Sequence, residues 1–292
     1  MKTWFITGAS RGFGARIAAL ALAQGDNVVA TARNAMSITE KLGTEKLGTE
    51  KLGTEKLGDR ANLLALPVDV THEAQVRAAV AAAIERFGQI DVLVNNAGFG
   101  LLGAVEEAGA EEVERLYRIN VFGLLAVTRA VLPSMRARRS GRILNISSIG
   151  GYRAGPGFGV YSSTKFAVEG LSEALHHELT PLGIHVTVVE PGYFRTDFLD
   201  SSSLSVSPSR IDDYNDTAGA VRTHAASLNH GQPGDPDKLA RVLVAFADAP
   251  NPPVRLPLGS DTVAAIEAKH VSDAAILAEW RSVSVSTDFA VA

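Results

Sequence analysis

Tyr161 and Lys165 lie four residues apart in the run Tyr-Ser-Ser-Thr-Lys. On a helix, this spacing places the phenol and the ammonium on the same face. A cation beside a phenol favours the phenolate, so we expect Lys165 to lower the pKa of Tyr161. Such a tyrosine can give up or recover a proton near neutral pH, as an acid–base catalyst does. Alone the pair is weak evidence, because it is common on helix surfaces.

A glycine-rich turn near the N-terminus has the composition of a phosphate-binding loop. Residues 7–14 read Thr-Gly-Ala-Ser-Arg-Gly-Phe-Gly and lie between a predicted strand and a predicted helix. Glycines allow the backbone to approach a phosphate, which the helix N-terminus attracts. The literal pattern G-x-G-x-x-G occurs instead at residues 98–103. No acidic residue follows at the expected distance, so we interpret that match as a coincidence in a loop near the cofactor.

The second predicted strand indicates which nucleotide binds. Such strands normally end in an acidic residue that binds the ribose hydroxyls of NAD. Here the strand ends in Thr-Ala-Arg, with Arg33 in place of the acid, and Arg11 adds a second cation in the first turn. Two guanidinium groups suit a 2′-phosphate. The sequence therefore favours NADP(H) over NAD(H); two solvated surface arginines are the alternative.

Short apolar segments alternate with longer helical patterns along the first two thirds of the chain. We expect strands at residues 3–7, 27–31, 62–66, 90–95, 142–147 and 184–190, and helices at residues 12–24, 72–87, 110–137 and 158–182. This alternation predicts a parallel sheet in the α/β class. We expect one doubly wound, Rossmann-type domain over residues 1–292, with three α/β/α layers and a ligand crevice at the carboxyl ends of the strands.

The C-terminal third departs from this rhythm. Residues 193–236 are rich in Ser, Asp, Gly and Pro and follow a strand, so we interpret them as a substrate-covering lid. Residues 237–292 form a predicted C-terminal helical extension, with helices at 237–248 and 261–281 and an extended piece at 254–258.

Residues 39–58 repeat the pentapeptide Thr-Glu-Lys-Leu-Gly four times. Five residues match neither the helical nor the strand period, and each interior glycine costs a helix about 1 kcal/mol. We interpret the segment as a duplication, natural or engineered, within a helix that needs one copy. An elongated helix and a protruding loop are both open outcomes.

Composition excludes several classes of function. The chain has 292 residues, 46% of them hydrophobic, a net charge of −4 and no cysteine. The charge argues against a nucleic-acid-binding surface, and the lack of cysteine fits a reducing compartment. We see no apolar stretch long enough to span a membrane and no metal-binding motif. We expect a soluble, cytoplasmic protein without a catalytic metal.

These motifs occur in an order that resembles the short-chain dehydrogenase/reductase family over about residues 2–196. The matching runs are residues 7–14, Asp69-Val70, Asn95-Asn96-Ala97-Gly98, Asn120, Ser147-Ser148, Tyr161 with Lys165, and Pro191-Gly192 with Thr196. Any one of them occurs by chance, whereas the complete series in order almost never does.

The resemblance implies a role for each matching residue. Tyr161 would be the general acid, Ser148 would bind the substrate oxygen with Ser147 as a weaker candidate, and Lys165 would bind the nicotinamide ribose. Asn120 would anchor a water that leads to Lys165. The implied cofactor contacts are Gly8, Ser10, Arg11, Gly12, Phe13, Gly14, Arg33, Asp69, Val70, Asn96, Ala97, Gly98, Tyr161, Lys165, Pro191, Gly192 and Thr196.

The implied activity is interconversion of a carbonyl compound and an alcohol with NADP(H). Aromatic and apolar loop residues favour an apolar or aromatic substrate; the candidates are Phe99, Leu101, Tyr152, Phe158, Tyr193 and Phe194. The long C-terminal part resembles the branch of retinol and 17β-hydroxysteroid dehydrogenase-type enzymes. This puts the family's usual tetramer in doubt, and a homodimer through the helices near residues 110 and 158 is compatible with the pattern. A non-catalytic NADP-sensing protein is the alternative function.

Overall fold

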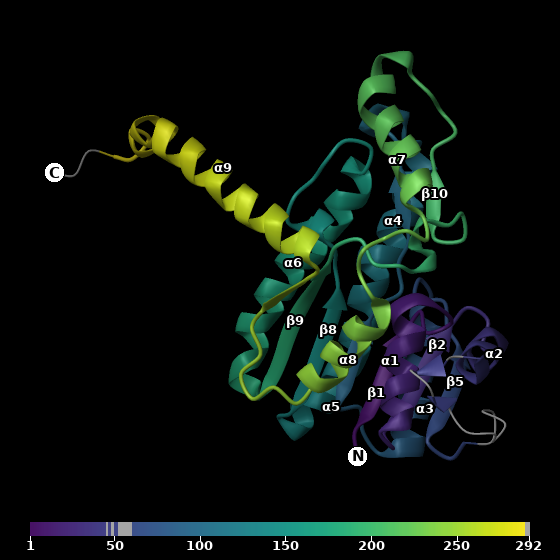
Figure 1. Ribbon diagram of the computed structural model, residues 1–292. Helices are drawn as coiled ribbons and strands as arrows, with labels where there is room; N and C mark the ends of the chain where they lie inside the picture. The colour runs from purple at the N-terminus through teal and green to yellow at the C-terminus, as the bar shows by residue number, and fades with distance from the viewer. Residues whose placement is uncertain (45, 48–49, 52–59, 290–292) are drawn as a thin grey trace.

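A seven-stranded parallel sheet forms the centre of this computed structural model, which describes residues 1–44, 46–47, 50–51 and 60–289 (Figure 1). The strands follow the order β11-β9-β8-β6-β1-β2-β5. Their bounds are β1 (Thr3–Thr7), β2 (Asn27–Ala32), β5 (Leu63–Pro67), β6 (Val92–Asn95), β8 (Gly141–Ile146), β9 (Ile184–Pro191) and β11 (Arg255–Leu258). The chain changes its winding direction between β1 and β6, which is where such sheets open a crevice.

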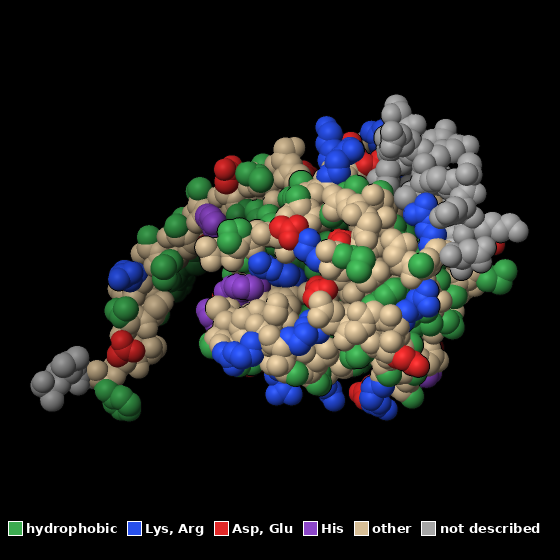
Figure 2. All heavy atoms as spheres, turned by 90° about the horizontal axis from the view of Figure 1, so that it is seen from below, with side chains coloured by type: hydrophobic (Ala, Val, Ile, Leu, Met, Phe, Trp, Pro, Cys, Tyr) green, Lys and Arg blue, Asp and Glu red, His purple; other side chains and the backbone are tan. Residues whose placement is uncertain are grey.

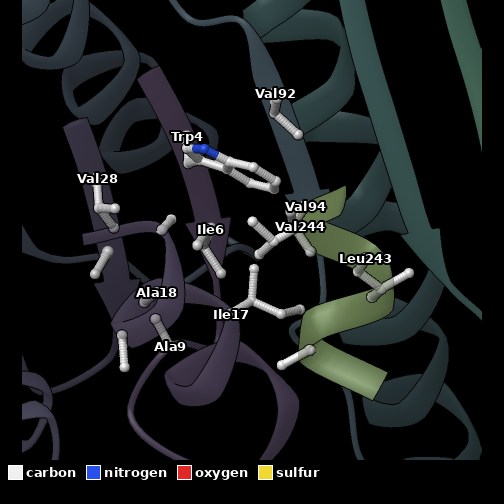
Figure 3. Close-up of a cluster of buried hydrophobic side chains, with 14 of the residues drawn as sticks. Trp4, Ile6, Ala9, Ile17, Ala18, Val28, Val92, Val94, Leu243 and Val244 are labelled. Atoms are coloured by element: carbon white, nitrogen blue, oxygen red, sulfur yellow. The ribbon is translucent and has the colours of Figure 1, made fainter. Parts of the chain in front are cut away.

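Strand β1 shows why the strands are apolar on both faces. Trp4 and Ile6 point to one side of the sheet, and Phe5 points to the other. Figure 3 shows Trp4 and Ile6 among side chains of helices α1 (Gly12–Ala23) and α8 (Pro236–Phe246). Each strand therefore needs a helical layer on both faces, as predicted.

The two helical layers have different members. Side chains of α1, α2 (Met36–Thr44) and α8 pack with Trp4 on one face. Side chains of α3 (Glu73–Phe87), α5 (Leu124–Arg138) and α6 (Gly159–Leu179) cover the other. The helix predicted at 110–137 is interrupted, since α4 (Ala110–Tyr117) reaches α5 through the π-helical turn Arg118–Gly123.

By length and composition alone, the run Ala110–Arg138 is long and apolar enough to cross a membrane, since one window of 18 residues within it has a mean hydropathy of 1.2. The sequence-based expectation that no stretch has this length is therefore wrong. Val127, Val131 and Met135 of this run are buried against the sheet. The packing is that of a core helix.

The C-terminal third is more regular than its composition predicts. The piece expected to be merely extended, β11, pairs with β9 as the seventh strand. Within residues 193–236, β10 (Leu204–Val206) pairs with β7 (Gly100–Leu102), and α7 (Ala220–Leu228) follows. Strands of three residues are too short to show an alternation of apolar and polar residues in the sequence, so they are recognised only from their pairing in the structure.

The first copy of the pentapeptide belongs to α2, where Ile38 and Leu42 are fully buried. Parts of the second and third copies pair as the short antiparallel strands β3 (Lys46–Leu47) and β4 (Glu50–Lys51). The rest of the repeat lies outside the described residues. One copy thus supplies the core contact of α2, as expected from the pattern.

Helix α9 (Ser260–Val285) projects from the body of the molecule (Figure 1). Thr262 in its first turn is buried, whereas Val271, Leu277 and Trp280 further along are exposed. Figure 2 shows hydrophobic side chains along this helix and interspersed acidic and basic side chains on the face in view.

Candidate active site

A cavity of about 880 Å³ opens where the strands end. It collects residues that follow β1, β2, β5, β6, β8 and β9, together with α6 and the 193–236 segment. The predicted site residues that line it are Gly8, Ser10, Arg11, Gly12, Phe13, Arg33, Asp69, Val70, Asn96, Ala97, Gly98, Phe99, Ser148, Phe158, Tyr161, Lys165, Pro191, Gly192, Tyr193, Phe194 and Thr196. Residues far apart in the sequence therefore meet at one edge of the sheet.

Two predicted substrate contacts lie elsewhere. Leu101 is buried behind Tyr161, in a cluster with Leu116. The ring of Tyr152 lies below the guanidinium of Arg255, 5.5 Å from it, and its hydroxyl contacts His270 of α9. Neither side chain lines the cavity. The structure therefore does not bring these two side chains to the cavity, because a place in the correct loop does not fix the direction of a side chain.

The glycine-rich turn has the geometry of a phosphate cradle. Gly8 and Gly12 have φ angles of +66° and +57°, in the left-handed region that favours glycine. No side chain caps the first turn of α1, which Arg11 precedes in extended conformation. Gly14 lies behind the cavity, and a Cβ there would meet both Asn96 Nδ2 and the Gly8 carbonyl oxygen at 2.6 Å. The turn suits a group that accepts hydrogen bonds from backbone amides.

Asn96 and Thr7 hold this turn in place. The Asn96 side-chain amide donates to the carbonyl oxygens of Thr7 and Gly8, at 2.9 and 3.0 Å. The Thr7 hydroxyl accepts from the backbone amides of Asn96 and Ala97, both at 3.0 Å. These bonds join the ends of β1 and β6, so the role of Asn96 includes positioning the loop.

Charged groups gather at the end of the cavity near β2. Arg33 is exposed, and Arg11 donates to the Ser202 carbonyl oxygen. Burial raises the pKa of the Asp69 carboxyl, but hydrogen bonds from Thr71 and the charges of His72 and Arg33 together hold it below its usual value. This corner therefore combines cations with a carboxylate that is already hydrogen-bonded.

Tyr161 is buried in the middle of the cavity wall, with only 6% of its surface exposed. Its ring packs against Phe158 and Phe198, with centroids 6.0 and 5.7 Å away. Burial raises the pKa of the Tyr161 phenol, and a hydrogen bond with the Ser148 hydroxyl opposes this rise. The expected lowering of this pKa by Lys165 is thus wrong in direction. The cost of burying a phenolate exceeds the benefit of its neighbours.

Lys165 lies one turn beyond Tyr161, also buried, with its Nζ 5.7 Å from the centre of the tyrosine ring. Nζ donates to the Ile146 carbonyl oxygen at the end of β8, at 2.8 Å. Burial lowers the pKa of Lys165 to about 8, although the charge of Glu169 opposes the shift. Lys165 can therefore exchange a proton close to neutral pH.

Asn120 lies in the π-helical turn, outside the lining of the cavity. Its Oδ1 accepts from the Phe99 amide at 3.1 Å, and its Nδ2 donates to the Phe99 carbonyl oxygen and to Thr164 Oγ1, at 3.0 and 3.2 Å. Asn120 thus fixes the loop of Gly98, where an added Cβ would lie 3.9 Å from Lys165 Nζ. Its role as the anchor of a water stays a prediction.

Several lining residues are absent from the predicted set. Phe198, Leu199 and Val221 come from the 193–236 segment, and Arg115 of α4 lies over the ring of Phe99 at 4.9 Å. The only sequence signal for Phe198 is its position two residues after Thr196. Nothing local distinguishes Val221 or Arg115 from surface residues of a helix.

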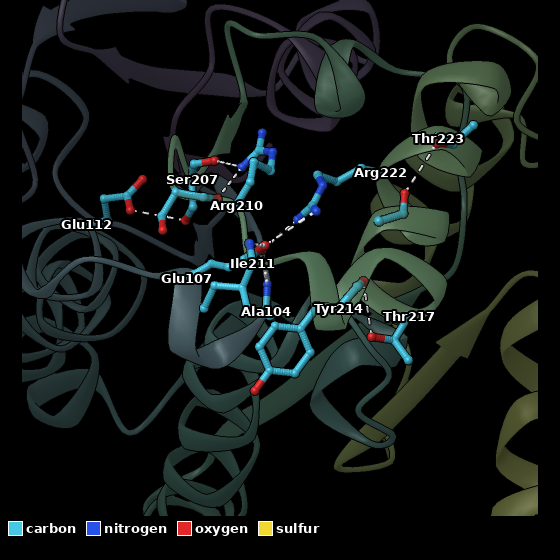
Figure 4. Close-up of polar contacts among 12 residues, drawn as sticks. Ala104, Glu107, Glu112, Ser207, Arg210, Ile211, Tyr214, Thr217, Arg222 and Thr223 are labelled. Carbon is cyan, nitrogen blue, oxygen red and sulfur yellow. Dashed lines mark hydrogen bonds and ion pairs between the residues drawn. The ribbon is translucent and has the colours of Figure 1, made fainter.

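The 193–236 segment is fastened to the body by Glu107, whose side chain is fully buried (Figure 4). Its carboxylate accepts from Arg222 Nη1 at 2.6 Å, from the Ala104 amide at 2.8 Å and from the Ile211 amide at 3.0 Å. The hydrogen bond from Arg222, with those from the two amides, lowers the pKa of Glu107 to about 2. Because the pKa of Glu107 is lower in the folded protein than in the unfolded chain, its ionised carboxylate stabilises the fold. This stabilisation is complete above about pH 4.5 and is lost as the pH falls through about 2.

We predict that Glu107→Gln loosens this attachment. The neutral amide leaves Arg222 without a carboxylate and weakens the bond from the Ile211 amide. At neutral pH, hydrogen exchange at the Ile211 amide should become at least roughly tenfold faster than in the wild type. Mass spectrometry of peptic fragments that contain Ile211 measures this.

Glu106→Gln is the matched control, because the neighbouring Glu106 accepts from the Tyr214 hydroxyl at the surface, at 2.7 Å, and does not bond the Ile211 amide. Its exchange at Ile211 should equal that of the wild type. Equal exchange rates in the two variants would contradict the anchoring role of Glu107.

Comparison with known proteins agrees with this geometry. The model of the short-chain dehydrogenase family matches residues 2–206. A 3-ketodihydrosphingosine reductase of Bacteroides thetaiotaomicron is 39% identical over 255 residues, which cover 87% of this chain and 86% of the relative.

Solved structures give the same result. The crystal structure of a short-chain dehydrogenase from Streptomyces avermitilis matches with a TM-score of 0.86 and 38% identity, over 99% of this chain and all of the other. A serine dehydrogenase complexed with NADP⁺ matches with a TM-score of 0.69 and 28% identity, over 88% and 94% of the two chains. This chain belongs to the short-chain dehydrogenase/reductase family and is an oxidoreductase that depends on a nicotinamide cofactor.

Proposed function

We propose that this protein interconverts a ketone or aldehyde and an alcohol by hydride transfer with NADP(H), and that Tyr161 is its general acid and base. The observation that carries the proposal is the meeting of three groups in one cavity. Ser148, Tyr161 and Lys165 all line it, Ser148 opposes the rise in the pKa of the Tyr161 phenol, and Lys165 follows Tyr161 by one turn of α6.

The chain's own groups can handle the proton of this reaction. A bound nicotinamide supplies the hydride. The substrate oxygen then gains negative charge, which needs hydrogen-bond donors and a proton source. Because burial raises its pKa, Tyr161 stays protonated at neutral pH and can donate its proton to this oxygen. Ser148 would donate a hydrogen bond to the same oxygen, and Lys165 would help to restore the proton of Tyr161.

The cofactor cleft fits a dinucleotide with an additional phosphate. The turn of Gly8 and Gly12 would hold the pyrophosphate at the N-terminus of α1. Asp69 and Val70 would border the adenine, and Thr196 would bind the nicotinamide carboxamide. Arg33, which stands where an NAD-binding protein has an acid, would bind the 2′-phosphate. These contacts support NADP(H).

An apolar or aromatic carbonyl compound is the proposed substrate class. The wall beside Tyr161 is formed by the rings of Phe99, Phe158 and Phe198, which favour contact with hydrocarbon. Leu199 and Val221 extend this wall along the 193–236 segment, which would act as the lid over the substrate. The name of the Bacteroides relative, a ketone reductase, is compatible with this class.

We predict that Tyr161→Phe lowers kcat at least about 100-fold, because the variant has no proton to donate. NADPH should bind with nearly unchanged affinity, since only the hydroxyl is lost. Tyr117→Phe is the matched control, because the Tyr117 hydroxyl bonds Ser163 outside the cavity. A screen of ketones with NADPH oxidation as readout measures kcat, and full turnover by Tyr161→Phe would reject its role.

The same screen separates the enzyme from a non-catalytic NADP sensor. A wild-type sensor would bind NADPH but would not oxidise it when a carbonyl compound is added. Its binding to a partner protein would depend on the redox state of the nucleotide. No contact among the described residues favours that function over catalysis.

We predict that Arg33→Ala raises KM for NADPH about tenfold or more and leaves KM for NADH within about twofold, because only NADPH carries the 2′-phosphate. Initial rates with both cofactors test this. Arg77→Ala is the control, since Arg77 pairs with Glu73 on α3 away from the cavity. An equal loss with both cofactors would show that Arg33 does not select NADPH.

We predict that Gly14→Ala weakens NADPH binding about tenfold or more, because the new Cβ meets a backbone oxygen that cannot move without distorting the cradle. Gly170→Ala is a matched control at an exposed position of α6, where the new Cβ would meet no atom within 4 Å beyond the adjoining turns of its own helix. It should bind NADPH normally and gain up to about 1 kcal/mol of stability. Fluorescence titration measures both affinities, and unchanged binding by Gly14→Ala would refute the prediction.

A further inference from the structure

A second charged cluster lies directly behind Lys165, on the side away from Tyr161. Glu169 follows Lys165 by one helical turn and is 3% exposed. Glu190 of β9 is 1% exposed. Arg255 of β11 joins the two, with Nη1 lying 2.6 Å from Glu169 Oε2 and 2.9 Å from Glu190 Oε1. Two buried carboxyl groups therefore share one nitrogen of a single guanidinium.

Charged groups on α6 and on two strands surround Glu169. Lys165 and Glu173 lie on its own helix, Glu190 on β9 and Arg255 on β11. Ser147, at the end of β8, favours the ionised form of Glu169, and Arg255 also reaches the half-exposed Glu173 at 3.4 Å. The ring of Tyr152 covers the guanidinium from outside. The cluster thus has one strong cation for two buried acids.

The shared guanidinium leaves one carboxyl close to its protonation point. Burial raises the pKa of Glu169 to about 7, Ser147 and Arg255 oppose this, and the like charge of Glu190 adds to it. Between mildly acidic and mildly alkaline pH Glu169 therefore loses a proton, and the negative charge appears one helical turn from Lys165.

That charge acts on Lys165. Burial favours the neutral amine, and the Glu169 carboxylate is the group that opposes it. Nζ also donates a hydrogen bond to the Ile146 carbonyl oxygen, which accepts from either charge state of the amine. Without Glu169, Lys165 would lose its proton at a lower pH.

We propose that Glu169 is a positioning residue for hydride transfer, which acts through Lys165: its carboxylate keeps Lys165 an ammonium at and above neutral pH. The role in catalysis rests on the proposed function. Arg255 and Glu190 set the pH at which the carboxylate forms, so the C-terminal strand takes part in setting the working range of the enzyme.

The test is the pH dependence of kcat/KM for ketone reduction by Glu169→Gln. The alkaline limb should move to lower pH by about one unit, because the neutral amide cannot support the ammonium. Near pH 6 the variant should equal the wild type, because Glu169 itself is protonated there. Glu173→Gln is the matched control, since Glu173 contacts the same Arg255 from a half-exposed position, and its profile should not move. A purely structural defect would lower the whole profile.

A second measurement needs no substrate. In wild-type protein labelled with ¹³C-lysine, the Cε resonance of Lys165, assigned from its absence in Lys165→Arg, should show an additional inflection near pH 7 when Glu169 ionises. In Glu169→Gln that inflection should vanish and the midpoint of Lys165 should fall.

The outcomes separate the two proposals. No turnover of any carbonyl by the wild type would overturn the proposed reaction, while the resonance still tests the coupling. An unshifted alkaline limb in folded Glu169→Gln, or a wild-type Lys165 resonance with a single inflection, would overturn the role of Glu169.

Discussion

The ammonium of Lys165 lies almost fully inside the protein, and burying a charge is costly unless other groups offset it. The carbonyl oxygen of Ile146 and the charge of Glu169 provide that offset. The first comes from the end of a central strand and the second from the next turn of α6. The position of α6 over the sheet, and therefore that of Tyr161, depends on stabilising the buried ammonium of Lys165.

The same burial controls the chemistry of Tyr161. Phe158 and Phe198 pack against the Tyr161 ring, and burial raises the pKa of its phenol, so the phenol keeps its proton at neutral pH. The loop of Gly98 closes the space next to Lys165, and Asn120 fixes that loop through both ends of its amide. Apolar packing and polar positioning therefore serve one purpose, which is to hold a proton donor and a cation together away from bulk water.

The sequence predicted what depends on local pattern and chain order. Apolar runs such as β1 gave the parallel sheet, because a strand covered on both faces needs no alternation. The motifs at the strand ends predicted residues that line the cavity, since parallel strands end at one edge. The direction of the Tyr161 pKa shift could not be predicted, because it depends on burial by Phe198, a residue from a segment without a period. The position of the Tyr152 side chain could not be predicted, because its partners, Arg255 and His270, are distant in the chain. The retinol and 17β-hydroxysteroid dehydrogenase-type branch and the homodimer stay predictions.

Arg255 is synthesised long after the two acids that it joins, and this order has a consequence for biogenesis. A nascent chain that folded as far as β9 would bury Glu169 and Glu190 without their guanidinium, at a cost of several kcal/mol. The charge balance of α6 around Glu169 therefore depends on a residue of β11, which is translated after the rest of the sheet.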